Sequence, residues 1–219
     1  MASATIEPMG IQAKLDIWLT HHSPTCPVVE FPHLGASTAL ERVHCRCGAF
    51  EGHYSREHRT GSNIVTDAGD TFYAQQLTNG AYTTATPTVA TVTNDFSTLE
   101  LSADAGANPA PGKSNHRGSL NSVISGSQKA ATSGYPRISD PDTDNSSAGT
   151  DVFTWSFTYS AGDFNDTDIS DGIITNTSPG ASEPVLNHFD ENVWSPSGVF
   201  DKTANDTLKF IVNHIFTGA

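Results

Sequence analysis

The chain has 219 residues, of which 36% are hydrophobic and only 16% charged, and its formal net charge at pH 7 is -13. This length accommodates one sizeable core, and much of the remainder is Gly, Pro, Ser, Thr, Asn and Asp, which is typical of short strands joined by turns. A surface this acidic repels phosphate backbones, so nucleic acid is not an expected partner. No apolar run of about 18 residues occurs, so no membrane-spanning helix is expected.

The N-terminal 60 residues are expected to form a strand and an irregular arm. In "IQAKLDIWLT", residues 11–20, apolar side chains at alternate positions predict a strand. Residues 21–60 are rich in His and Cys and show no clear period, so we expect an arm with one short strand near residues 40–46. The first residues lack a basic segment followed by an apolar one, so no signal peptide is expected and synthesis takes place in a cytoplasm.

The rest of the chain predicts one helix and then several strands. "NIVTDAGDTFYAQQLTNG" favours a helix, because Thr66 or Asp67 can cap it and "TNG" supplies a stop. "TVATVTNDFSTLELS" predicts one or two strands, and "GANPAPGKSNHRGS" at 106–119 a long loop. Clean alternation in "DVFTWSFTYS" and "DTLKFIVNHIF" predicts two more strands. In the last of these, His214 shares a face with Phe210 and is expected to be a hydrogen-bonded core or interface histidine.

Short strands separated by Gly, Pro and Asn turns, without an internal repeat, favour a mainly β protein. We expect an antiparallel β-sandwich, jelly-roll-like, with one short helix and an irregular N-terminal arm. The expected division is an N-terminal strand and His/Cys-rich arm over residues 1–60 and a β-sandwich domain over residues 61–219. Trp18, Trp155 and Trp194 are expected to be core or interface anchors.

The stretch "HCRCGAFEGHYSREH", which begins at residue 44, concentrates two cysteines and three histidines in a cysteine-poor chain. If it is extended, Cys45 and Cys47 point to the same face with Cα atoms about 6.6 Å apart. That separation strains a disulfide but suits two thiolates on one tetrahedral ion. The pattern therefore predicts a structural zinc site, with Cys26 as the third ligand.

The fourth ligand of this site is expected to be His53 or His58, and Glu57 or His44 could replace it. An arm with little apolar surface would gain folding free energy from such an ion. The alternative is three ordinary thiols among scattered polar histidines, and the sequence leaves both interpretations open.

One acidic segment carries a weaker signal. "DPDTDN" places Asp140, Asp142 and Asp144 at alternate positions with Asp151 at the twelfth, as in a calcium loop. Asn145 stands where such a loop has Gly, so a solvated acidic turn is the preferred interpretation.

Enzymatic motifs are absent from the sequence. No nucleophile elbow, P-loop or dinucleotide fingerprint occurs. The carboxylates that could form a glycosidase pair lie in a Gly/Asn/Thr-rich segment: Asp163, Asp166, Asp168 and Asp171. We expect that the chain is not an enzyme. The structural zinc described above is the one cofactor that the sequence suggests.

The C-terminal segment "VFDKTANDTLKFIVNHIFTG" resembles the last strand of many virion structural proteins of tailed bacteriophages, which follows a K-T-x-x-D-T-L pattern. "HFDENVWSPSGVF", "ISDGIIT", "GSNIVTDAGDTFYAQQ" and "GSQKAATSGYPRISDPDTDN" also resemble stretches of proteins encoded among phage head and tail genes. The resemblance covers roughly residues 61–219 and does not include the His/Cys arm.

This resemblance implies a non-enzymatic particle component, and within a virion we favour a decoration (cement) protein that staples neighbouring capsomers. Its expected partners are the major capsid protein or other virion proteins and further copies of itself. The expected location is the virion, assembled in the cytoplasm of the host bacterium. A tail or baseplate adaptor or receptor-binding module is the alternative, and a carbohydrate-binding module or glycosidase a weaker one.

Overall fold

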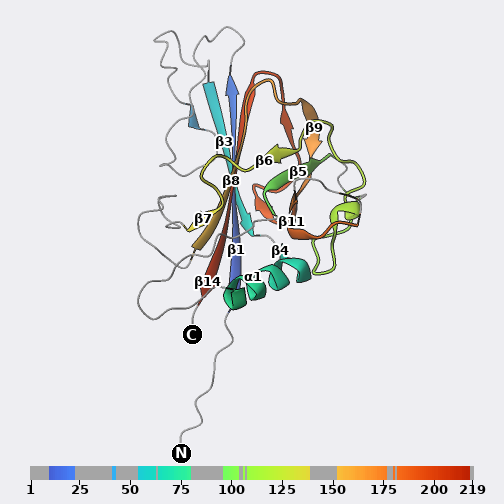
Figure 1. The fold of residues 1–219 in the computed structure, drawn as a ribbon. Helices are drawn as coiled ribbons and strands as arrows, with labels where there is room; N and C mark the ends of the chain where they lie inside the picture. Colours follow the sequence, from blue (N-terminus) through green and yellow to red (C-terminus); the bar gives the residue numbers. More distant parts are fainter. Residues whose placement is uncertain are drawn as a thin grey trace, which may run out of the picture.

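The computed structural model describes residues 10–22, 41–42, 54–62, 64–79, 96–103, 106, 108–138, 152–176, 180 and 182–217. They form two antiparallel β-sheets packed face to face, with one helix at one end of the sandwich (Figure 1). The expected antiparallel β-sandwich is confirmed, and its jelly-roll-like variant stays a prediction. Among the described residues, the single helix is too short and too polar to cross a membrane.

The elements are, in chain order, β1 (Gly10–His22), β2 (Glu41–Arg42), β3 (Tyr54–Ser62), β4 (Ile64–Val65), α1 (Asp67–Asn79), β5 (Thr98–Ser102), the 3₁₀ turn η1 (Arg117–Ser119), β6 (Lys129–Ala130), β7 (Arg137–Ile138), β8 (Val152–Tyr159), β9 (Asp166–Ile169), β10 (Asp171–Thr175), β11 (Val185–Asp190), β12 (Trp194–Ser195), β13 (Phe200–Lys202) and β14 (Asp206–Thr217).

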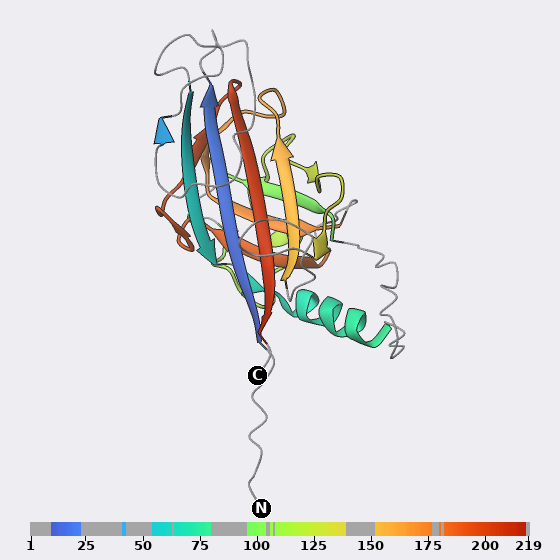
Figure 2. The same cartoon turned by 90° about the vertical axis from the view of Figure 1, so that its left-hand side faces the viewer.

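The larger sheet, sheet A, has the strand order β12-β3-β1-β14-β8-β7, with β2 beside β3 (Figure 2). β1 and β14 pair along their whole length, from Gly10 opposite Thr217 to His21 opposite Asp206. β1 also pairs with β3, so it lies in the middle of the sheet. The sandwich therefore includes β1 and most of β3, which precede residue 61, where the sequence predicts that the folded domain begins.

The smaller sheet, sheet B, has the order β4-β11-β10-β5-β6, and its strands run across those of sheet A (Figure 1). β10 pairs with both β5 and β11, and a bulge interrupts the β10–β11 register between Ile174 and Thr175. A separate two-stranded sheet of β9 and β13 lies beside the sandwich.

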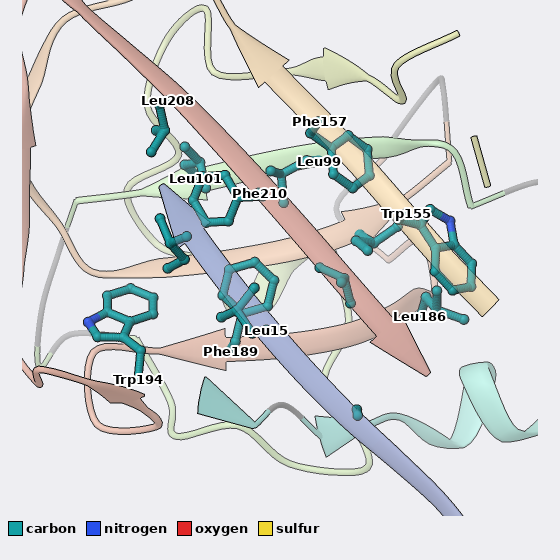
Figure 3. Close-up of a cluster of buried hydrophobic side chains, with 14 of the residues drawn as sticks. Leu15, Leu99, Leu101, Trp155, Phe157, Leu186, Phe189, Trp194, Leu208 and Phe210 are labelled. Carbon is teal, nitrogen blue, oxygen red and sulfur yellow. The ribbon is translucent and has the colours of Figure 1, made fainter. Parts of the chain in front are cut away.

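The core fills the space between the two sheets (Figure 3). The alternation predicted for β8 and β14 is confirmed, because Trp155, Phe157, Leu208 and Phe210 are fully buried on the face toward sheet B. Side chains of β1 complete this face. Sheet B contributes the opposing side chains: Leu99, Leu101, Ile174, Leu186 and Phe189.

Helix α1 begins where the sequence predicts, with Thr66 as its N-terminal cap. The backbone N–H of Gly69 donates to Thr66 Oγ1 at 3.1 Å. The backbone N–H of Thr66 in turn donates to the carbonyl of Leu186 at 3.1 Å, and the Thr66 hydroxyl donates to the carbonyl of Val185. The cap therefore fixes the start of the helix against β11.

Gly69→Ala is expected to destabilise the protein, although the same change in a free helix gains about 1 kcal/mol. A Cβ at Gly69 would collide with the backbone oxygen of Leu186 and lie 2.7 Å from Val65 Cγ1. We expect a net loss of about 1–2 kcal/mol in the free energy of unfolding, measured by urea denaturation. Thr71→Ala, at an exposed position of the same helix, is the matched control and should change it by no more than about 0.5 kcal/mol.

The ion pair between His21 and Asp206 at one end of β1 and β14 predicts a pH-dependent stability. His21 Nδ1 lies 3.0 Å from Asp206 Oδ1, and this hydrogen bond raises the pKa of His21 above 6.5. Burial alone would raise the pKa of Asp206, but hydrogen bonds from His21 and Thr203 lower it below 3.8. The contribution of His21 to folding stability is therefore lost as the pH rises through its raised pKa. The contribution of Asp206 is lost as the pH falls through its lowered pKa.

We therefore expect Asp206→Asn to cost most stability between about pH 4 and about pH 6.5, with a smaller cost on either side. The measurement is the free energy of unfolding of the original protein and of Asp206→Asn across this range. Taking the difference between them cancels the titrations that both proteins share. A difference that grows steadily above pH 6.5 would contradict the assignment.

Candidate functional site

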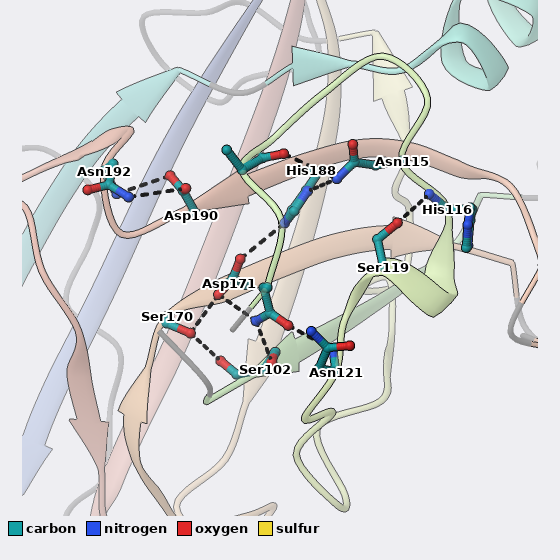
Figure 4. A network of polar contacts seen from close by, with 12 residues as sticks. Ser102, Asn115, His116, Ser119, Asn121, Ser170, Asp171, His188, Asp190 and Asn192 are labelled. Carbon is teal, nitrogen blue, oxygen red and sulfur yellow. Dashed lines mark hydrogen bonds and ion pairs between the residues drawn. The ribbon is translucent and has the colours of Figure 1, made fainter. Parts of the chain in front are cut away.

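A group of polar and charged side chains, most of them buried, lies on the face of sheet B that points away from sheet A (Figure 4). Leu99 and Leu101 of β5 face the core, so Glu100 and Ser102 face the opposite way. The loop over residues 108–124 folds back across this face. We call this group the loop–sheet cluster; its members are the buried Glu100, Ser102, Ser170, Asp171 and His188 and the half-buried Asn108, Asn115 and Arg117.

Asp171 of β10 and His188 of β11 form the centre of the loop–sheet cluster. His188 Nε2 lies 3.1 Å from Asp171 Oδ1, and both side chains are almost completely buried. On the other side of the ring, the Asn115 amide nitrogen lies 2.7 Å from His188 Nδ1. Because Asn115 belongs to the loop, this chain of three side chains joins the loop to both strands.

The second carboxylate oxygen of Asp171 holds another part of the loop. The amide of Asn108 donates to Asp171 Oδ2 and to Ser102 Oγ, each at 2.9 Å. The Ser170 hydroxyl donates to the same carboxylate oxygen at 2.6 Å. Asn108 Oδ1 accepts the backbone N–H of Asn121 at 2.7 Å, so this residue also braces the loop internally.

An ion pair and a small apolar contact complete the attachment of the loop. Arg117 donates to both carboxylate oxygens of Glu100, through Nε at 2.8 Å and through Nη2 at 3.3 Å. Leu120 of the loop packs against Ile173 and Val185 of the sheet. The paired guanidinium and carboxylate offset the cost of burying Glu100, which is only 2% exposed.

The geometry of the loop–sheet cluster favours a cross-link over a reaction centre. Both ring nitrogens of His188 and both oxygens of Asp171 have partners inside the cluster. The Ser170 hydroxyl donates to Asp171 rather than to His188, so the histidine is not placed to activate it. Among the residues that the structure describes, no three His, Cys, Asp or Glu side chains are grouped as metal ligands.

A second buried histidine, His214, joins three elements. Its Nδ1 is hydrogen-bonded to the hydroxyl of Tyr73 from α1, and its Nε2 lies 3.5 Å from the amide nitrogen of Asn187 from β11. Burial lowers the pKa of His214 to about 3 and raises the pKa of Tyr73 well above its usual value. The prediction of a hydrogen-bonded core histidine is confirmed.

Lys202 is a buried amine that could suggest a nucleophile. Its Nζ donates to the carbonyl of Phe164 at 2.8 Å and to those of Ala161 and Thr203 at 3.4 Å each. Burial lowers the pKa of Lys202. Because three carbonyls surround an amine that is 1% exposed, a substrate has no path to it, and the side chain fastens the β9–β13 region.

Of the predicted zinc ligands, His58 and the alternative Glu57 lie within the described residues, and Glu57 pairs with Arg59. His58 Nε2 lies 2.9 Å from Asp16 Oδ1, and the His58 ring stacks on Trp18 with 3.6 Å between the ring centroids. A metal bound by His58 while this contact persists would have to use Nδ1, with Asp16 orienting the ring. The remaining predicted ligands lie outside the described residues: Cys26, Cys45, Cys47, His53 and the alternative His44.

The structural zinc therefore stays a prediction. We expect elemental analysis of the purified protein to find about one equivalent of metal per chain, held mainly by thiolates. Cys45→Ser should reduce that amount. A metal-free chain in which all three thiols titrate freely would favour the alternative of ordinary thiols.

The carboxylates that the sequence suggested for a calcium loop or a glycosidase pair do not form one common site among the described residues. Asp140, Asp142, Asp144 and Asp151 of the calcium-like segment lie outside the described residues. Of the four carboxylates considered for a glycosidase pair, only Asp171 lies in the loop–sheet cluster. The others are Asp163, whose carboxylate pairs with Lys129 at 2.5 Å, and Asp166 and Asp168 in β9.

Sequence reasoning missed the loop–sheet cluster. Glu100, Asp171 and His188 occupy alternate positions in strands whose other face is apolar, a pattern that usually indicates a solvent-facing side. A weak signal exists in the loop itself, because Asn108, Asn115 and Arg117 bring hydrogen-bond donors to a Pro/Gly-rich segment.

Comparison of this chain with known proteins gave no match. No protein-family model matches it, and neither the curated proteins nor the solved structures contain a match. Its function is therefore inferred from its own residues and geometry.

Proposed function

We propose that the chain is a structural component of a tailed-phage particle, most specifically a capsid decoration protein that staples neighbouring capsomers. The observation that carries the proposal is the loop–sheet cluster, whose charged groups pair with each other and fasten a long loop onto a sandwich. A rigid unit with preset loops suits repeated assembly around symmetry axes, because little conformational entropy is lost when it docks. The net charge of -13 suits a surface that faces solvent rather than packaged DNA.

The closed state of the loop–sheet cluster supports a non-enzymatic role. A general base needs a nitrogen or carboxylate oxygen within reach of a substrate proton. In His188 and Asp171 these atoms bind Asn115, Asn108 and each other. Catalysis at this site would first require the loop to leave and several buried hydrogen bonds to break.

The weaker alternative, a carbohydrate-binding module, lacks support from the aromatic side chains that could form a platform. Phe189 is fully buried and Trp194 is 2% exposed, with its indole N–H donating to the carbonyl of Gly198 at 2.8 Å. A hollow of about 610 Å³ lies between β1 and β3. The described residues that line it are not aromatic: Ile11, Gln12, Ala13, Lys14, Thr60, Gly61 and Ser62.

The copy number in the particle tests this proposal. In purified virions of the phage that encodes the chain, quantitative mass spectrometry should give on the order of hundreds of copies, comparable to the major capsid protein. Six to a few dozen copies, roughly one or a few rings, would instead identify the tail or baseplate component. Absence from the virion would refute both.

A further inference from the structure

His214 is the point at which α1, sheet A and sheet B meet. It lies on β14 in sheet A, contacts Tyr73 of α1 through Nδ1, and faces Asn187 of sheet B through Nε2. Its ring also packs against Trp155 of β8, with 5.0 Å between the ring centroids. The side chain is 0% exposed.

The described residues around His214 provide no counter-ion for an imidazolium. The described residues that face it from the packed elements are Ala13 on β1, Tyr73 on α1, Phe153 and Trp155 on β8, Asn187 on β11 and Phe216 on β14. Tyr73 is the single titratable group among them, and burial keeps its hydroxyl protonated. Of the two ring nitrogens, which face Tyr73 and Asn187, one accepts a hydrogen bond in the neutral ring, and a second proton would turn that acceptor into a donor.

Two parts of helix α1 are fixed by different chemistry. At the start, the backbone of Asp67 donates to the Lys113 carbonyl, and Lys113 pairs with Asp70 at 2.6 Å. Farther along, Phe72 and Tyr73 enter the core, and the Tyr73–His214 hydrogen bond is a polar contact that attaches this part. None of the contacts at the start involves a group that gains charge on mild acidification.

We propose that His214 is an acid-sensitive anchor of α1: protonation of its ring releases the helix around Tyr73 while the two sheets stay paired. The buried ring takes up a proton only at about pH 3, whereas an exposed histidine does so near pH 6.5. Release of α1 exposes the ring and is therefore coupled to proton uptake between about pH 3 and pH 6.5. From about pH 7.5 to about pH 4.5 the equilibrium constant for release of the helix should rise about 100-fold.

Hydrogen exchange of the full chain at about pH 7.5 and about pH 4.5 tests the anchor. Rates are divided by the intrinsic exchange rate at each pH, and the amides of β8 and β14 serve as internal references. The protection of the α1 amides should fall about 100-fold on acidification and lie below that of β8 and β14. Equal protection of α1 and β8 at both pH values would overturn the proposal, because the helix would then leave only on global unfolding.

Two variants assign the effect to the histidine. In His214→Gln the acid-induced loss of α1 protection should disappear, whereas His188→Gln, the matched control at a buried histidine paired with a carboxylate, should retain it. If His214→Gln does not fold, Tyr73→Phe removes the same hydrogen bond and keeps the titrating ring. It should lower α1 protection at neutral pH without changing that of β8, and unchanged α1 protection would overturn the anchor.

Discussion

Phe210→Ala is expected to lower the free energy of unfolding by about 3–5 kcal/mol, the largest loss among single truncations in this core. Phe210 is fully buried on β14, next to the central strand β1, and its ring lies 5.8 Å from that of Phe189 across the sandwich. The truncation leaves a cavity between two sheets whose backbones are fixed by pairing on both sides, so the gap cannot close. Urea denaturation of both proteins measures the loss.

Phe216→Ala is the matched control for this truncation. Phe216 lies on the same face of β14 but near its end, where its side chain is only partly buried. Its removal should cost clearly less than that of Phe210. Equal costs would show that the sandwich interior is not the main source of stability, and soluble Phe210→Asp would contradict the face assignment itself.

Asp171→Ala is expected to lower the free energy of unfolding by about 3–5 kcal/mol, because it breaks a buried charged network rather than an apolar contact. The carboxylate accepts from Asn108 and Ser170 and pairs with His188, and the substitution leaves the buried Ser170 and His188 and the half-buried Asn108 without this acceptor. The amides of the loop over residues 108–124 should also lose protection against hydrogen exchange.

Asp190→Ala provides the control, because Asp190 is a buried carboxylate on a neighbouring strand of the same sheet. Its described side-chain bonds go to Asn192, within the adjacent turn. We expect a cost of about 1 kcal/mol and no effect on the loop. An Asp171→Ala protein that is as stable as Asp190→Ala, with a protected loop, would show that the loop is held by its apolar contacts alone.

The elements with a strong local signal are the ones that the sequence predicts correctly. The strict alternation in residues 11–20, 152–159 and 206–216 yields β1, β8 and β14, because one buried face leaves a period of two in the sequence. The cap at Thr66 likewise predicts the start of α1, since the capping hydrogen bond depends only on residues three positions apart.

The elements that depend on distant partners cannot be predicted from such local patterns. β3, "YSREHRTGS", has no apolar period, and its sequence predicts part of an irregular arm. It is a strand because it pairs with β1, and Arg59 on its inner face donates to the carbonyls of Pro196 and Gly198. The loop–sheet cluster is missed for the same reason, because only the tertiary fold brings Asn115 to His188.

The most direct test of the proposed function is binding of the purified chain to capsids from a phage in which its gene is deleted. Sedimentation should show saturable binding at on the order of hundreds of copies per capsid, and the bound capsid should melt at a higher temperature than the bare one. Binding confined to tails, or capsids whose melting temperature is unchanged by the saturating protein, would contradict a decoration protein.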